Sequence, residues 1–145
     1  NSNLDLLFKS IDKIMKSINR LYEFRVLGGE PFVNKQIGKI INRLVSYNNA
    51  DNVVVYTNAT IVPKGENLDC LKNTKVLMNL TNYGHLSRNH DKLIETLKAN
   101  NISYVTHIPI WTDSGTINYQ EKTVSKLKHM FKNCCANEVI SLLHI

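Results

Sequence analysis

The sequence predicts an α/β domain made of repeated βα units around a parallel sheet. Three observations point to this class: helical and strand patterns alternate along the chain, the links between them are short, and the strand patterns are apolar runs that include a continuous β-branched one. Such alternation is typical of parallel strands joined by right-handed helical crossovers. The chain has 145 residues, 43% of them apolar, which suits one domain.

The first half of the chain predicts two helices and two strands. Apolar residues recur at three- and four-residue steps from Leu4 to Ile18, which predicts an amphipathic helix. An apolar run over residues 21–27 predicts a strand, and we expect Asn34 to cap a helix over about 35–47. The β-branched run Val53–Tyr56 predicts a strand that is buried on both faces.

The second half continues the alternation. A short helix is expected near 67–72, a strand over 75–80, a helix over 90–99 and a strand over 102–110 whose regular pairing Pro109 should end. A helix over about 120–132 follows, and residues 139–144 are a possible last strand. We expect the helix over 120–132 to bury its apolar side chains, namely Val124, Leu127, Met130 and Phe131.

The composition limits which classes of binding partner and which cellular compartment we expect. The formal net charge is +6, but the basic residues are dispersed at helical spacing, which favours solvated helix faces over a nucleic-acid footprint. No apolar run is long enough to span a membrane, which needs about 18 residues. Three cysteines make a poor disulfide framework, so we expect a cytoplasmic protein. We also expect the sheet to pair through an open edge.

The polar clusters fall where strands are predicted to end. The most informative cluster is Gly28-Gly29-Glu30-Pro31, because ligands of parallel α/β proteins bind at the carboxyl ends of the strands. The glycines allow a ligand to approach the backbone closely, and the proline withholds an N–H, so carbonyl groups are in excess. A carbonyl-rich turn with a carboxylate suits a cation such as an ammonium better than a phosphate. Thr57-Asn58, Thr81–Gly84 and His107–Trp111 follow the later strands.

In order and spacing, these clusters resemble the radical S-adenosylmethionine (SAM) superfamily. The resemblance spans residues 21–115 and rests on Gly-Gly-Glu-Pro, Tyr56-Thr57-Asn58, Thr81-Asn82-Tyr83-Gly84 and the segment that begins at Trp111. It implies a partial (β/α)6 barrel that binds SAM and a [4Fe–4S] cluster. With an electron from flavodoxin or ferredoxin, such enzymes cleave SAM to a 5′-deoxyadenosyl radical, which abstracts hydrogen from a substrate. The substrate, a peptide or a small metabolite, is not readable from the chain.

The resemblance also implies roles for individual residues. Gly28, Gly29, Glu30 and Pro31 match the turn that holds the SAM ammonium. Asn58 and Thr81 match polar positions near the SAM carboxylate and ribose, with capping or turn duty as an equal alternative. His107, Ile108 and Pro109 match the strand that lines the adenine, although a core role is as plausible for them. By the same resemblance, Trp111 and Asp113 would lie near the opening of the substrate site, with surface packing as the favoured alternative.

The chain departs from the family in its cysteines. It contains no Cys-x3-Cys-x2-Cys motif, so we expect it to be inactive alone and to be an internal part of a radical SAM protein, with a degenerate homologue as the alternative. Residues 1–132 would be the partial barrel and 133–145 the start of a cysteine-bearing segment of the SPASM or twitch kind. At most one of Cys134 and Cys135 would bind an auxiliary metal site, and Cys70 is expected to be a buried apolar residue. A different class also stays open: a non-catalytic α/β domain that binds a nucleotide or a nucleic acid.

Overall fold

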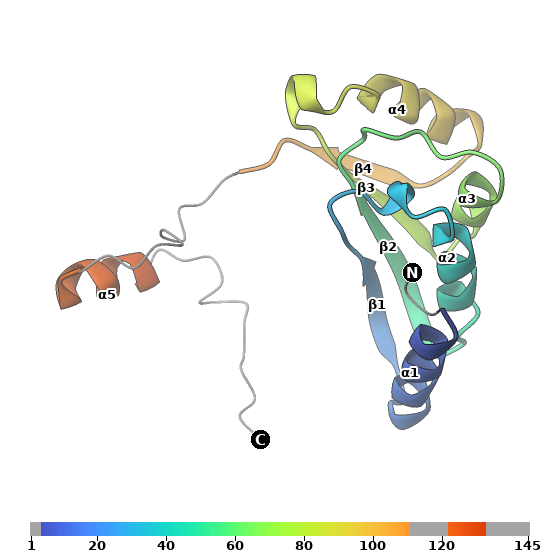
Figure 1. Cartoon of the computed structure of the whole chain (residues 1–145), viewed down its shortest axis with the longest axis horizontal. Helices are drawn as coiled ribbons and strands as arrows, with labels where there is room; N and C mark the ends of the chain where they lie inside the picture. The colour runs from blue at the N-terminus through green and yellow to red at the C-terminus, as the bar shows by residue number, and fades with distance from the viewer. Residues whose placement is uncertain (1–3, 111–121, 133–145) are drawn as a thin grey trace. The chain divides into compact units, whose positions relative to one another are not determined.

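The computed structural model describes residues 4–110 and 122–132 (Figure 1). The chain divides into two compact units, residues 1–109 and residues 110–145, which we describe separately. Nearly all described residues belong to the first unit, and that unit holds the whole sheet.

The sheet of the first unit has four parallel strands in the order β1-β2-β3-β4. Its strands are β1 (Leu21–Val26), β2 (Ala50–Thr57), β3 (Val76–Thr81) and β4 (Tyr104–His107). The predicted α/β class with a parallel sheet is therefore confirmed. Whether these units form part of a (β/α)6 barrel stays a prediction.

The helices of the first unit lie on one side of the sheet (Figure 1). They are α1 (Leu4–Ser17), α2 (Ile37–Val45), α3 (Glu66–Asp69) and α4 (His90–Ala99), with short 3-10 turns η1 (Pro31–Val33), η2 (Cys70–Lys72) and η3 (Gly84–Leu86). This one-sided arrangement follows from the strand order. Each strand is added to the same edge as the one before, and right-handed crossovers then place every helix on the same face.

The core lies between the sheet and this helix layer. Val53 and Val55 of β2 and Met78 and Leu80 of β3 are completely buried there, together with Ile41 of α2. Leu93 and Leu97 of α4 complete it, as their spacing predicts. Alternate strand residues point to the other face of the sheet, which no helix of the first unit covers.

Two expectations for the elements are wrong in detail. Asn34 does not cap α2, because Gln36 occupies that position without a side-chain hydrogen bond. Instead, the Asn34 side chain accepts a hydrogen bond of 2.9 Å from the Gln36 N–H, because η1 inserts a 3-10 turn before the helix. Strand β2 begins at Ala50, earlier than its β-branched run, because it pairs with β1 from Leu21 onward.

The second unit contains one described helix, α5 (Val124–Lys132). None of its residues is buried within the described part of this unit, where Val124, Leu127 and Phe131 are exposed, and the expected burial of an apolar stripe stays a prediction. The described part of this unit contains no second apolar element against which the stripe could pack. The possible strand over 139–144 lies outside the described residues. No helix in the described residues is long and apolar enough to cross a bilayer.

Candidate functional site

The site begins at the carboxyl end of β1, where the chain turns into α2. Gly28 and Gly29 follow this strand after Leu27 and are exposed, while Glu30 is half-buried and Pro31 is buried. Strand β2 runs parallel to β1, so Thr57 and Asn58 emerge beside this turn. The structure thus brings together two clusters that lie 27 residues apart in the sequence.

Glu30 ties the two strand ends together. One carboxylate oxygen accepts hydrogen bonds from the Thr57 hydroxyl at 2.7 Å and from the Asn58 N–H at 3.0 Å. The other oxygen accepts the Phe32 N–H at 3.2 Å, which caps η1. A carboxylate has roughly four acceptor positions, so three donors leave little capacity for a ligand. Glu30 therefore shapes this turn more than it faces an ammonium.

Asn58 forms the second link between the same strand ends. Its side-chain N–H donates to the Gly29 carbonyl at 2.9 Å. Its side-chain oxygen accepts from the Thr60 N–H at 3.0 Å and from the Thr60 hydroxyl at 2.6 Å. The amide thus fixes the orientation of the Gly29 peptide. This structural role in the turn is compatible with a ligand bound at the turn.

Neither packing nor backbone conformation explains the two glycines. A Cβ atom at Gly28 or Gly29 would meet no atom within 4 Å, and neither residue has a positive φ. Residues with side chains could stand at both positions without harm to the fold. Glycine at these positions also leaves the backbone open to close approach by another molecule.

The Gly28 carbonyl is available to such a molecule. The Gly29 carbonyl accepts from Asn58, and those of Glu30 and Pro31 accept from Val33 and Asn34. Within the described part of the chain, the Gly28 carbonyl accepts no hydrogen bond. The open space at the turn continues into a groove of about 580 Å³ that Gly28, Glu30 and Pro31 line together with apolar side chains of α1, β1 and α2.

Ser87 connects β2 to β3 in a similar way and was not singled out from the sequence. This buried hydroxyl lies near the Asn58 carbonyl at 2.7 Å and the Thr81 carbonyl at 3.2 Å, so its single proton is shared between them. It also accepts the Tyr83 N–H at 2.9 Å. The burial of Ser87 indicates a structural role. The sequence does not show this role, because a single serine in a loop belongs to no pattern.

A strained residue lies between these links. Ala59 is completely buried and has a φ of 57°, in the left-handed region that costs a non-glycine residue roughly 1–2 kcal/mol. Its N–H donates to the Thr57 hydroxyl and its carbonyl accepts from the Asn89 N–H, both at 3.1 Å. These bonds and the core contacts of its methyl group hold the chain in the conformation that presents Asn58.

Thr81 and Ile108 lie further along the same edge of the sheet. The Thr81 hydroxyl is 3.4 Å from Nε2 of His107, the last residue of β4. Ile108 follows β4 and is 77% exposed, so the core alternative for this residue is wrong because regular pairing stops at His107. An exposed apolar side chain at a strand end is compatible with contact to a planar base. That contact stays a prediction.

Asn79 is a polar residue of the sheet that the sequence pattern missed. It lies on β3, on the face opposite the helices, and its register partner on β2 is Tyr56. The Asn79 side-chain oxygen is buried, and it is the only buried side-chain N or O atom of the described residues without a hydrogen-bond partner. A buried acceptor of this kind costs stability of about 1–3 kcal/mol. A ligand with an N–H or O–H group would offset that cost.

The described residues offer no place for a metal cluster. No three His, Cys, Asp or Glu side chains gather within residues 4–110 and 122–132. Cys70 is 4% exposed, and burial, reinforced by nearby carboxylates, raises the pKa of its thiol to about 11. The expectation that Cys70 is a buried residue is confirmed. Cys134 and Cys135 lie outside the described residues, as do Trp111 and Asp113.

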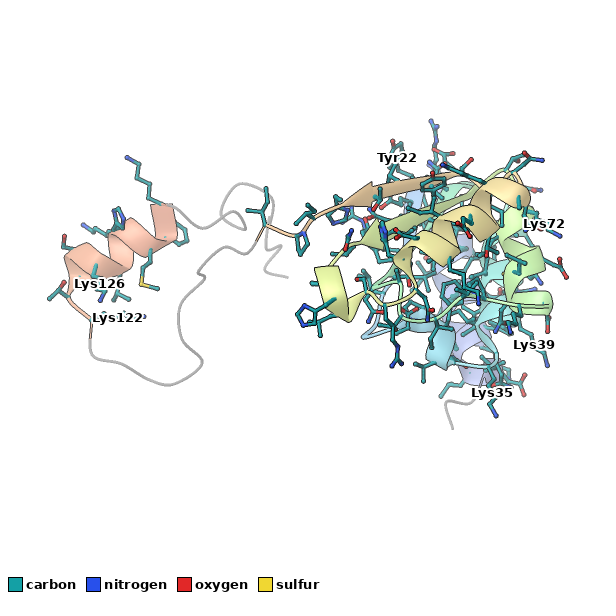
Figure 2. The ribbon with its side chains drawn as sticks, turned by 90° about the horizontal axis from the view of Figure 1, so that it is seen from above. Tyr22, Lys35, Lys39, Lys72, Lys122 and Lys126 are labelled. Atoms are coloured by element: carbon teal, nitrogen blue, oxygen red, sulfur yellow. The ribbon has the colours of Figure 1, made fainter. Side chains whose placement is uncertain are left out.

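The positive charge is spread over the surface rather than gathered at this site. Lys35 and Lys39 near and on α2 and Lys72 of η2 are exposed and point outward from the helix layer (Figure 2). Lys122 and Lys126 belong to the second unit. The clusters Gly28–Pro31, Thr57-Asn58 and Thr81–Gly84 contain no lysine or arginine, and the nearby loop after β3 carries the exposed Arg88.

No family model, no curated protein and no solved structure matches this chain.

Proposed function

We propose that the turn at Gly28–Pro31 and the adjoining end of β2 bind the methionyl ammonium of SAM, as part of a radical SAM-type enzyme. The observation that carries the proposal is the pair of glycines. Both have open space where a side chain would be, both lack a positive φ, and the Gly28 carbonyl has no partner in the described residues. A free carbonyl beside an unobstructed backbone suits an ammonium, whose three N–H donors need acceptors.

The surrounding groups support the rest of this ligand. Hydrogen bonds from the Asn58 backbone to Glu30 and from the Asn58 side chain to Gly29 fix the turn, so the Gly28 carbonyl is held in place before a ligand binds. Thr81 supplies a hydroxyl on β3, the strand next to β2. A hydroxyl suits a carboxylate or a ribose hydroxyl. Pre-organisation of this kind increases affinity because less freedom is lost on binding.

The iron–sulfur cluster does not fit the residues of this chain. The sequence holds three cysteines and no Cys-x3-Cys-x2-Cys motif, and the described residues hold no cluster of metal ligands. SAM binding is therefore the part of the proposed function that these residues can perform. Chemistry that follows from the cluster is not assigned to them.

The test is calorimetric titration of the chain with SAM and with 5′-methylthioadenosine, which lacks the amino-acid group. We expect weak SAM binding and at least tenfold weaker binding of 5′-methylthioadenosine. Gly28→Val should abolish the difference without loss of melting temperature, because its side chain would enter the open space. Glu95→Gln, at an exposed position on α4, is a control away from the edge.

The proposal fails if both ligands bind equally or if Gly28→Val leaves SAM binding intact. Tight binding of a DNA or RNA oligonucleotide, with a steep dependence on salt, would favour the alternative of a nucleic-acid-binding domain.

A further inference from the structure

The outer edge of β1 is open. This strand is the first in the order of the sheet and pairs with β2 alone, so its other side meets no strand within residues 4–110 (Figure 1). Alternate backbone N–H and C=O groups of such an edge strand point outward, where a further strand can pair with them. The opposite edge of the sheet is β4, which is shorter, with four residues against six in β1.

The edge strand β1 carries two opposite charges on one face. Glu23 and Arg25 are two residues apart, so their side chains lie on the same face of the sheet, and the Arg25 Nε donates to one carboxylate oxygen of Glu23. The other Glu23 oxygen and the two terminal nitrogens of Arg25 have no partner among the described residues. Each group therefore keeps the capacity for a second ion pair.

Phe24 lies between the two charges and is the centre of a self-complementary pattern. When a second copy of β1 runs antiparallel to the first with Phe24 opposite Phe24, Glu23 of each copy lies directly opposite Arg25 of the other. Side chains that are directly opposite lie on the same face, with their Cβ atoms about 5 Å apart. Tyr22, which is 72% exposed, then lies opposite Val26, and aromatic and β-branched residues form favourable cross-strand pairs.

Charge disfavours the neighbouring registers of the same contact. A centre of symmetry at Glu23 would place two carboxylates directly opposite each other, and a centre at Arg25 would do the same with two guanidinium groups. Centres at Tyr22 or Val26 would pair fewer residues of the strand. The sequence of β4 contains no lysine, arginine, aspartate or glutamate, so charge selects no register at that edge.

We propose that two copies of this chain associate through the outer edge of β1, antiparallel about Phe24, so that their sheets join into one. The occupant of this edge is a second copy because its charges complement themselves, as a two-fold contact between identical surfaces requires. Glu23 and Arg25 would form two ion pairs across the contact, one on each side of Phe24. This contact goes beyond the proposed SAM site and does not depend on it.

The first test is analytical ultracentrifugation of the whole chain from micromolar to millimolar concentration, where we expect a reversible equilibrium between monomer and dimer. Arg25→Gln should raise the dissociation constant of the dimer at least fivefold, because it removes both ion pairs of the contact. Arg20→Gln is the matched control, since Arg20 is also exposed and paired with a carboxylate, Asp51, but precedes β1. Both variants should keep the melting temperature of the native chain, as exposed ion pairs contribute little stability.

A second test mixes two charge-reversed variants, Glu23→Arg and Arg25→Glu. Each variant alone places like charges opposite each other in the dimer, so each should be more weakly associated than the native chain. Their mixture should form a heterodimer, because two arginines of one copy then face two glutamates of the other. Native mass spectrometry identifies the heterodimer by its mass. The ion pair within a single strand cannot produce this result, since both variants lack it.

The inference is overturned if the native chain stays monomeric over the whole concentration range, or if Arg20→Gln weakens the dimer as much as Arg25→Gln. It is also overturned if the two charge-reversed variants are folded by circular dichroism and their mixture contains no heterodimer. If either of these variants fails to fold, the comparison of Arg25→Gln with Arg20→Gln decides.

Discussion

The Glu30 carboxylate accepts a 2.7 Å hydrogen bond from the Thr57 hydroxyl, and this contact joins the ends of two neighbouring strands. Glu30→Gln should therefore destabilise the fold. The substituted side chain keeps one oxygen and presents an NH2 group to either the Phe32 N–H or the Asn58 N–H, which are themselves donors. Hydrogen bonds to charged groups contribute about 1.5–3 kcal/mol, and we expect a loss of that order in urea unfolding.

Glu95→Gln is the control for that variant, because Glu95 is exposed on α4. Equal unfolding midpoints for Glu30→Gln and Glu95→Gln would show that Glu30 does not hold the strand ends.

Gly38 of α2 is a glycine that the packing requires. A Cβ atom there would lie 2.8 Å from the Asn67 side-chain oxygen and 3.0 Å from the Glu66 carbonyl, and the same Asn67 oxygen accepts the Gly38 N–H at 2.9 Å. Gly38→Ala should cost about 1–3 kcal/mol, the usual range for overpacking, although alanine normally favours a helix.

Gly29→Ala is the matched comparison, since its Cβ would meet nothing within 4 Å. Its melting temperature should stay the same or rise, because alanine restricts the unfolded chain. If Gly38→Ala proved as stable as Gly29→Ala, the close contact between α2 and α3 would be refuted.

Asp12 of α1 anchors that helix to α2 through Tyr47 and Arg43. The Tyr47 hydroxyl donates to the carboxylate, and Arg43 donates at 2.6 and 2.7 Å. The Tyr47 bond, then the Arg43 bond, lowers the pKa of Asp12 below its ordinary value of 3.8. A lowered folded-state pKa means that the contribution is present above pH 3.8 and disappears as the pH falls through the lower, folded value.

Asp12→Asn should therefore flatten the acid side of the stability profile. Urea midpoints measured between pH 7 and pH 2 should decline less in this variant than in the native chain. An unchanged decline would mean that other carboxylates account for acid unfolding. Asp91→Asn, at an exposed carboxylate on α4, is a suitable control.

Cys70 should be unreactive while the chain is folded. Burial raises the pKa of its thiol to about 11, so at pH 8 roughly one thiol in a thousand is ionised, and the sulfur is also shielded. In a variant with Cys134→Ser and Cys135→Ser, a disulfide reagent should label Cys70 only at the rate of unfolding. Rapid labelling without denaturant would contradict the buried position.

Much of the fold could be predicted from patterns in the sequence. The continuous β-branched run at Val53–Tyr56 predicts a strand buried on both faces, and Val53, Val54 and Val55 are buried, whereas the spacing of Leu93 and Leu97 reflects burial of one face of α4. Parallel strands also place their carboxyl ends on one edge, which predicts that Gly29 and Asn58 are neighbours, and the Asn58 side chain donates to the Gly29 carbonyl.

The details of the site could not be predicted, because they depend on distances across the fold. The donors around Glu30 come from Thr57 and Asn58, and a sequence shows only that all three are polar. The buried and unpartnered oxygen of Asn79 depends on which side chains surround it in the fold, and the sequence does not show them. Helix α5 shows another limit of the sequence. Amphipathic spacing predicts the helix, but it does not show which element covers the apolar side chains.

The most direct test of the central claim is an NMR titration of the chain with SAM, in which the backbone amide signals of Gly28, Gly29 and Asn58 are followed. We expect these signals to shift with SAM and with methionine, 5′-methylthioadenosine to leave them unchanged, and Gly28→Val to remove the response. Shifts confined to other parts of the chain, or equal shifts with 5′-methylthioadenosine, would contradict the assignment of this turn to an ammonium.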